Sequence, residues 1–145
     1  MNPIPDHIAA FFRQNHVVSL AAAHEGDIWS ACCFYVPDLQ AGRLIVLTSR
    51  TTRHGVLMSA NPRIAGTVAG QPKSLAQIRG IQFQARAEII EDEAERKTAC
   101  ALFYQAHPVA RAMKSDVWAL VLESVKFTDN KQVFAQKTVW QRNEV

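Results

Sequence analysis

A short polar stretch, TSRTTRHG at residues 48–55, holds the side chains of this chain that are best suited to chemistry. It follows the apolar run at residues 44–47. Arg53 and His54 lie in it with a further arginine and four hydroxyl side chains. Hydroxyls and a guanidinium at the start of a helix are typical of a phosphate site, because free N–H groups there attract an anion. The alternative is an ordinary polar turn, in which Thr52 only caps a helix and the arginines are solvated.

Length and charge restrict the class of protein. A chain of 145 residues suits one domain, residues 1–145, with a single core. The formal net charge of +3 is a mild basic excess, and the lysines and arginines are spread along the sequence. We therefore expect no nucleic-acid partner, because nucleic-acid binders carry a denser basic face.

The apolar segments and the cysteines bear on location. No segment reaches the roughly 20 apolar residues that span a bilayer, and the N-terminal sequence lacks the pattern of a signal peptide. Cys32, Cys33 and Cys100 have no C-x-x-C spacing, which argues against a disulfide framework or a zinc site. The histidines are not spaced as metal ligands either. We expect a cytoplasmic protein with reduced thiols, no membrane partner and no metal.

Apolar periodicity and turn residues predict the order of the elements. We expect strands at residues 17–23, 28–36, 43–49, 64–69, 78–90, 116–127 and 133–142. Helices are expected from Pro5 to Asn15, from Thr51 or Thr52 to Ala60, and from the acidic residues 91–95 to Pro108. The HEGD sequence predicts a hairpin between the first two strands. TDNK predicts a turn before the last strand.

The arrangement of these elements favours a mainly β fold. Residues 78–90 alternate between apolar and polar side chains, which predicts one buried and one wetter face. Most strands follow one another along the chain instead of alternating with helices. This order favours an antiparallel sheet with added helices. Six or seven strands in so short a chain favour a small barrel, because closure removes exposed edges.

Several motifs carry a resemblance to a known family. Residues 43–89 contain a strand that ends in Thr48, a helix opened by Thr52-Arg53-His54, and an Asn-Pro pair at its end. This pattern resembles the pyridoxamine 5'-phosphate oxidase-like superfamily. The YhbP-like branch is the closer likeness. It is based on AGTVAGQPK at 65–73, IRG-x-QF at 78–83, PVAR at 108–111 and KFTDN at 126–130.

This resemblance implies an FMN-binding split barrel, an antiparallel six- to seven-stranded Greek-key-like barrel. It also implies a homodimer with two FMN clefts at the subunit interface. Thr52, Arg53 and His54 would hold the phosphate, and the strand end would lie along the isoalloxazine ring. The cofactor-binding residues implied are Leu47, Thr48, Ser49, Thr52, Arg53, His54 and Gln82. The alternative to contact with the flavin edge is that Gln82 bonds to a partner on a neighbouring strand.

The sequence departs from the oxidase in three places. His54 stands where the family usually has a lysine, so the charge of the site depends on pH. SACCFYV at residues 30–36 replaces the oxidase's Arg-x-x-Leu-Leu-Lys strand. TVWQRNEV has no clear counterpart of its C-terminal Trp-Arg segment. Oxidation of pyridoxamine 5'-phosphate is therefore not expected.

The function implied is a flavin-dependent oxidoreductase that acts on an unidentified small molecule, with no catalytic residue assigned. A non-catalytic module that binds a flavin or another phosphate ligand is the alternative. Another is a structural dimer whose cleft is a relic. A haem or deazaflavin ligand is a weaker option. In each flavin case the ring performs the electron chemistry, and the protein positions it.

Other residues have a structural and a functional interpretation. Cys32 and Cys33 should point to opposite faces of one strand, and burial is favoured over a redox or metal role. Lys73 is read as a surface lysine, with contact to a ligand across the dimer as the alternative. Three tryptophans are expected in the barrel or the dimer core: Trp29, Trp118 and Trp140.

Overall fold

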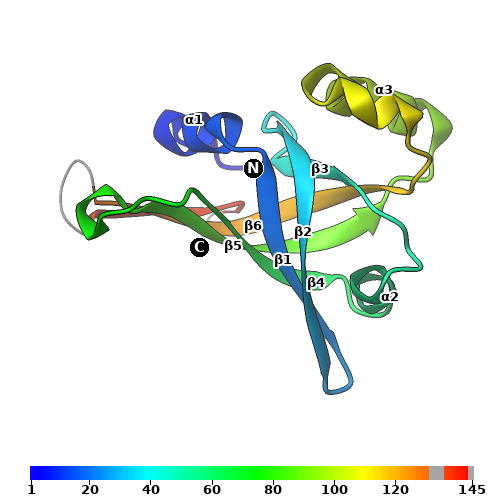
Figure 1. Cartoon of the computed structure of the whole chain (residues 1–145), viewed down its shortest axis with the longest axis horizontal. Helices are drawn as coiled ribbons and strands as arrows, with labels where there is room; N and C mark the ends of the chain where they lie inside the picture. Colours follow the sequence, from blue (N-terminus) through cyan, green and yellow to red (C-terminus); the bar gives the residue numbers. More distant parts are fainter. Residues whose placement is uncertain (131–135, 144–145) are drawn as a thin grey trace.

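The structure is a computed structural model that describes residues 1–130 and 136–143 (Figure 1). The strands among these residues are β1 (Val17–His24), β2 (Asp27–Asp38), β3 (Arg43–Leu47), β4 (Arg63–Ala69), β5 (Arg79–Ile89), β6 (Val117–Asp129) and β7 (Gln136–Gln141). The helices are α1 (Asp6–Gln14), α2 (Arg53–Ala60) and α3 (Glu93–Ala106), with 3₁₀ turns η1 (Leu75–Gln77) and η2 (Pro108–Ala112). The predicted start of the last strand, 133–135, and Lys131 of the predicted turn lie outside the described residues.

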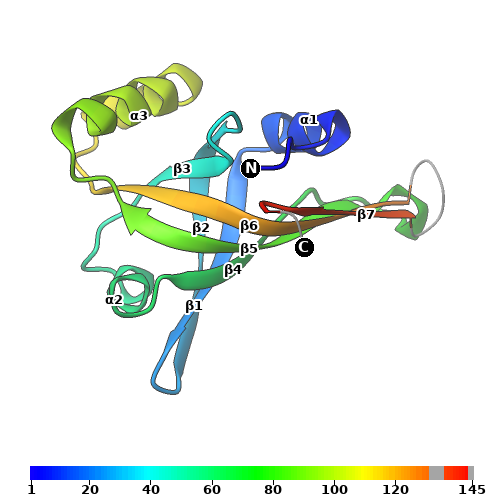
Figure 2. The ribbon, with the colours of Figure 1, turned by 180° about the vertical axis from the view of Figure 1, so that it is seen from behind.

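The described strands form one antiparallel sheet that closes on itself. Their order is β3-β2-β1-β4-β5-β6-β7, and β3 also pairs with β6. The N-terminal half of β6 pairs with β3 over Val117–Val121, and its C-terminal half pairs with β7 over Ser124–Asp129. Six strands therefore make a closed ring, and β7 extends the sheet beside β6 (Figure 2). The prediction of a small antiparallel split barrel is confirmed.

A tight turn joins β1 to β2, as the HEGD sequence predicts. Glu25 and Gly26 have φ angles of 48° and 82°, the left-handed pair that a two-residue hairpin turn requires. The hairpin register pairs His24 with Asp27. Its tip projects away from the barrel beyond α2 (Figure 1). The tip therefore places residues of β2 beside the start of α2.

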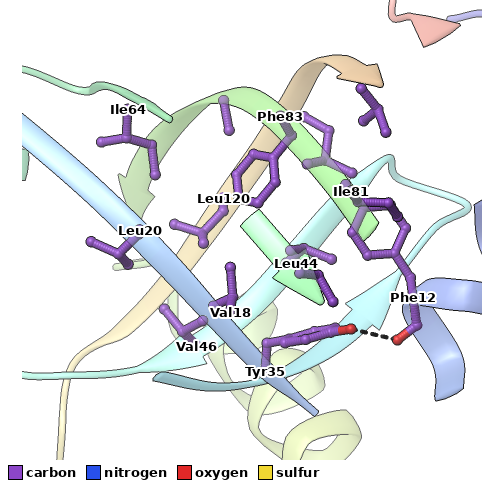
Figure 3. Close-up of a cluster of buried hydrophobic side chains, with 14 of the residues drawn as sticks. Phe12, Val18, Leu20, Tyr35, Leu44, Val46, Ile64, Ile81, Phe83 and Leu120 are labelled. Atoms are coloured by element: carbon purple, nitrogen blue, oxygen red, sulfur yellow. Dashed lines mark hydrogen bonds between the residues drawn. The ribbon is translucent and has the colours of Figure 1, made fainter. Parts of the chain in front are cut away.

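The barrel core is filled by alternate side chains of the strands. On β5, Ile81, Phe83, Ala85 and Ala87 are buried, which confirms the predicted alternation. They meet buried residues from the other strands, including Val18, Leu20, Leu44, Val46, Ile64 and Leu120 (Figure 3). The Tyr35 hydroxyl donates a 2.6 Å hydrogen bond to the Phe12 carbonyl and so fixes α1 against β2. Burial of these apolar side chains is the main stabilising contribution to the fold.

Two helices pack on different parts of the barrel. The buried face of α1 includes Ile8, Phe11 and Phe12, at the spacing that the sequence predicts. Asp92 caps α3 by accepting a 3.0 Å hydrogen bond from the Glu95 backbone N–H. Phe103 of α3 then packs in a second apolar cluster with residues of β2, β3 and β6. Among the described residues, no helix combines the length and apolar character needed to cross a membrane.

Three details differ from the predictions. β3 ends at Leu47 rather than Ser49, because the Thr48 N–H bonds to the Asp116 carbonyl and the chain then leaves the sheet. Cys32 is exposed rather than buried, since it lies on the outer face of β2. Trp29 is 46% exposed and lies outside the barrel core, whereas Trp118 and Trp140 are buried in it. Burial of Trp29 in a dimer remains a prediction.

Candidate functional site

The polar loop at residues 48–52 leads directly into α2. The Thr52 hydroxyl accepts a 3.0 Å hydrogen bond from the Gly55 backbone N–H and donates a 2.8 Å bond to the Ser49 carbonyl. Thr52 is thus the N-cap, one of the two residues that the sequence predicts. A Cβ at Gly55 would collide with the Ser49 carbonyl oxygen, so the tight entry to α2 requires glycine there.

Arg50 anchors this loop to the start of β6. Its backbone N–H and its Nη2 bond to the two carboxylate oxygens of Asp116 at 2.8 and 3.1 Å. A longer contact of 3.4 Å reaches Glu91. The hydrogen bonds from Arg50 lower the pKa of Asp116. Arg50 therefore holds the loop in place instead of presenting a free cation.

His54 lies at the first turn of α2 and connects back to the end of β3. Its Nε2 is 2.8 Å from the Thr48 hydroxyl and 3.2 Å from that of Thr52. The Thr52 hydroxyl gives its hydrogen to Ser49, so it can only accept from His54, whereas the Thr48 hydroxyl can donate to Nε2 or accept from it. Burial lowers the pKa of His54. The imidazole is therefore mostly neutral near pH 7.

Arg53 points toward the β1–β2 hairpin. Its Nη2 donates a 2.8 Å hydrogen bond to Asp27, and its Cζ lies 4.0 Å from the centre of the Trp29 ring. These contacts form a salt bridge and a cation–π pair on exposed side chains. The guanidinium beside the helix N-terminus already has an acidic partner.

A cavity of about 550 Å³ opens beside this loop. Its walls come from β2, the end of β3, the start of α2, and the segment from α3 to η2. The lining residues are Cys32, Cys33, Phe34, Leu47, Thr48, His54, Phe103, Ala106, His107, Pro108, Val109, Ala110 and Met113. None of them is a lysine, arginine, aspartate or glutamate. The volume is in the range of small-molecule and cofactor sites.

One edge of β2 is open along this cavity. In the described sheet, β2 pairs with β1 over residues 27–34 and with β3 over residues 35–38, so the second edge of residues 27–34 is unpaired. Cys32, Cys33 and Phe34 are consecutive and all line the cavity, although their side chains alternate between faces. This part of the strand therefore presents its edge to the cavity, where backbone N–H and C=O groups can meet a ligand.

His107 lines the cavity, and no motif in the sequence assigns it a functional role. It ends α3, and its Nε2 donates a 2.9 Å hydrogen bond to the Tyr35 carbonyl of β2. Its ring centre is 4.8 Å from that of Phe103 and 5.3 Å from that of Phe34. The Pro108 that follows it marks the helix end in the sequence, but nothing local indicates its contact with β2.

The predicted cofactor residues are only partly brought together. Leu47, Thr48 and His54 line the cavity. Ser49 and Thr52 form the loop behind it, and Arg53 turns toward the hairpin. Gln82 is exposed on β5, between Thr67 of β4 and Lys126 of β6, and does not line the cavity. Lys73 is exposed in the loop before η1. The assignment of these residues to a cofactor stays a prediction.

The described part of the chain contains no group of three or more histidine, cysteine, aspartate or glutamate side chains arranged to hold a metal ion. Cys33 is half-buried, and burial next to Cys32 raises the pKa of its thiol. These features give no basis for a metal centre among the described residues.

Comparison with known proteins places the chain in a family. A family model described as pyridoxamine 5'-phosphate oxidase matches residues 4–129. The chain belongs to this family. A UPF0306 protein of Haemophilus ducreyi is 44% identical over 144 residues, 99% of both chains. UPF0306 protein YhbP of Escherichia coli is 40% identical over 135 residues, 93% of this chain and 96% of that protein. The predicted YhbP-like branch is confirmed.

Solved structures of the same fold are more distant in sequence. A heme binding protein from Mycobacterium smegmatis superposes with a TM-score of 0.74 at 19% identity, over 97% of this chain. The chain spans 60% of the length of that protein. A FAD-binding protein from Mesorhizobium loti gives a TM-score of 0.67 at 17% identity, over 84% of this chain and 91% of that one. The split-barrel fold is therefore shared with proteins named for two different cofactors.

Proposed function

We propose that the chain binds FMN in this cavity and serves a flavin-dependent redox reaction on a small molecule. The observation that carries the proposal is that one uncharged cavity reaches from the open edge of β2 to the N-terminus of α2. An isoalloxazine ring has broad apolar faces and one polar edge. A cavity with apolar walls and exposed backbone groups along one strand suits both features.

The phosphate is expected outside the apolar part, at the start of α2. Within the described residues, the backbone N–H groups of Arg53 and His54 have no protein acceptor, whereas the N–H of Gly55 is capped by Thr52. Free N–H groups in the first turn and the helix dipole favour an anion. Arg53 adds a fork of donors if it turns from Asp27 or shares with it. The residues present thus fit FMN.

The flavin, when bound, supplies hydride or electron transfer. The cavity walls at Leu47 and Phe103 would position the ring and keep water from it. The ring of His54 is held through its Nε2 by the hydroxyls of Thr48 and Thr52. The SACCFYV segment of β2 offers no cation to a phosphorylated substrate. We therefore do not assign pyridoxamine 5'-phosphate as the substrate.

An absorbance spectrum of freshly purified protein and a fluorescence titration with FMN test this proposal. We expect a yellow protein or saturable quenching of FMN, with a dissociation constant below tens of micromolar, a weak but measurable regime. Titration without saturation contradicts the proposal. Anaerobic addition of NADH or NADPH then separates an enzyme from a binding module, because only an enzyme with a matching donor bleaches the flavin.

A haem ligand is the second candidate. Two imidazoles, those of His54 and His107, lie in the lining of one otherwise apolar cavity, and a structural neighbour is named as a heme binding protein. A single histidine is a common axial ligand of haem iron. Titration with hemin should then give a Soret band that shifts on binding. The His107→Ala variant should lose this shift, whereas His7→Ala, at a histidine outside the cavity lining, should keep it. Hemin absorbance that stays unchanged excludes the candidate.

A homodimer is proposed from the outer face of the sheet. Cys32, Ser19, Thr67 and Gln82 form one row across β2, β1, β4 and β5, and each is exposed. These side chains are uncharged, so the face can pack against a second copy. Cys32 also lines the cavity, so such a partner would border the cleft. Light scattering after size exclusion should give a molar mass twice that of one chain. For Thr67→Arg the measured mass should fall to that of a single chain.

A further inference from the structure

The same cavity restricts the kind of molecule that can bind beside the flavin. Its lining contains aromatic, aliphatic, thiol, hydroxyl and imidazole side chains but no lysine, arginine, aspartate or glutamate. We propose that the outer part of the cavity, bounded by Phe34, Val109 and Met113, binds an uncharged, planar, conjugated substrate. This inference depends on the proposed function for the position of the flavin, but the preference for an uncharged ligand can be measured without it.

Charged ligands are disfavoured because nothing in the wall compensates them. A carboxylate, phosphate or ammonium that enters such a cavity loses its hydration and gains no ion pair. The nearby arginines of the polar loop are engaged elsewhere, Arg50 with Asp116 and Arg53 with Asp27. Arg53 remains available to a phosphate only at the rim, on the side of the hairpin. The cavity itself therefore selects against anions.

A planar shape follows from the aromatic side chains. Phe34 and Phe103 both contact the ring of His107, so three rings gather along one wall. Flat conjugated molecules stack favourably on such rings. Met113 completes the wall with a side chain that adapts to different outlines. Thr48 and the two histidines are the polar residues available for one or two neutral hydrogen-bonding groups of the ligand.

The entrance lies at η2. Val109 is 85% exposed and Met113 is 53% exposed, although both line the cavity, and Phe34 on β2 is 60% exposed. Apolar side chains that face both solvent and a cavity form an apolar mouth. A charge placed at this mouth changes ligand selection without disturbing the core, because neither Val109 nor Met113 is buried.

Two fluorescent probes of similar shape test the proposal, neutral 1-aminoanthracene and anionic anthracene-2-carboxylate. Each is titrated into the protein with and without FMN. We expect the neutral probe to bind at least tenfold more tightly. Met113→Lys and Val109→Lys should each reduce this ratio severalfold, whereas Val139→Lys, at an exposed position of β7 outside the lining, should leave it unchanged.

The outcomes separate the two proposals. Equal affinity for both probes, or a ratio that Met113→Lys and Val109→Lys leave unaltered, overturns the uncharged-substrate inference whether or not FMN binds. Absence of FMN binding together with a clear neutral preference overturns the flavin proposal and still supports an uncharged ligand. Neutral-probe binding that persists at saturating FMN supports adjacent sites for both, whereas displacement of the probe by FMN that a higher probe concentration reverses indicates one shared site and overturns binding beside the flavin.

Discussion

The Nε2 atom of His54 lies 2.8 Å from the hydroxyl of Thr48, so the first turn of α2 is bonded to the residue that follows β3. This contact joins the predicted phosphate loop to the wall of the apolar cavity. It also fixes the ring of His54, a titratable side chain that belongs both to the predicted cofactor residues and to the cavity lining. The protonation state of His54 should therefore influence how a phosphorylated ligand binds.

We predict that FMN affinity depends on pH through His54. Burial lowers its pKa, so the ring is mostly neutral at pH 7. A bound phosphate favours the protonated form, so binding takes up a proton and affinity rises as pH falls toward the lowered pKa. As pH falls, the FMN affinity of wild type should rise about fivefold more than that of His54→Gln, a difference on the order of 1 kcal/mol.

Fluorescence titrations of wild type and His54→Gln with FMN between about pH 8 and pH 5.5 check this. The phosphate itself titrates near pH 6 in both proteins, so the difference between them isolates the imidazole. Riboflavin, which has no phosphate, is the ligand control and should show the same pH dependence in both. Parallel FMN curves for the two proteins would show that His54 carries no charge toward the phosphate.

The Arg53–Asp27 pair leads to a second prediction. Asp27 holds Nη2 of Arg53 at 2.8 Å and so competes with an incoming phosphate for the guanidinium. Asp27→Asn should therefore raise FMN affinity about threefold to tenfold, about 1 kcal/mol, and leave riboflavin affinity unchanged. Arg53→Gln should lower FMN affinity. Isothermal titration calorimetry measures both.

Glu25→Gln is the matched control for Asp27→Asn. Glu25 is an acidic residue of the same hairpin, and its contact is with His24 instead of Arg53. If both variants raise FMN affinity equally, the effect is general electrostatics of the hairpin and the competition is refuted. If Arg53→Ala leaves every ligand assay unchanged, the cleft is better described as a relic.

Local signals in the sequence predict much of this fold, but not how the site is assembled. The Glu25-Gly26 turn, the Thr52 cap and the alternation along β5 depend on neighbouring residues, so they can be read from the chain. The contacts that shape the site join residues far apart. Arg50 meets Asp116 66 positions away, and His107 meets Tyr35 72 positions away. These pairs follow from the register of the closed barrel, which no local pattern specifies.

The exposure of Cys32 has a similar cause. Two adjacent thiols on a strand point to opposite faces, and only the sheet order decides which face is covered. The partner of Arg53 depends likewise on a hairpin that projects beyond α2 (Figure 1). From residue type alone, Arg53 is therefore expected to be free to bind phosphate, whereas in the folded chain it forms an ion pair with Asp27.

A third prediction concerns the stability of α2. The Thr52 hydroxyl serves both as the cap of Gly55 and as a donor to Ser49. Thr52→Ala should lower the free energy of unfolding by about 1 kcal/mol, and Thr52→Ser should restore most of it. Urea denaturation followed by circular dichroism measures the change. Thr51→Ala, at an exposed neighbour, should cost much less, and equal costs at the two positions would refute the capping role.

The Arg50–Asp116 pair predicts how acid affects the fold. Its hydrogen bonds lower the pKa of Asp116, so the folded chain binds fewer protons at this carboxylate than the unfolded chain does. The stabilisation is therefore present above the ordinary value of about 4 and is lost as pH falls through the lowered pKa. Asp116→Asn lacks this contribution. The gap in denaturation midpoint between wild type and Asp116→Asn should be widest near neutral pH and should narrow below about pH 4.

Glu91→Gln provides the comparison for this last measurement. Glu91 contacts the same guanidinium at a longer distance, 3.4 Å, and its side chain is 72% exposed. Glu91→Gln should therefore change the denaturation midpoint less than Asp116→Asn does at every pH. Because Asp116 also fixes the backbone of Arg50, Asp116→Asn should weaken FMN binding as well, whereas Glu91→Gln should not. A midpoint gap for Asp116→Asn that stays constant from neutral to acid pH would mean that its carboxylate charge does not hold the loop.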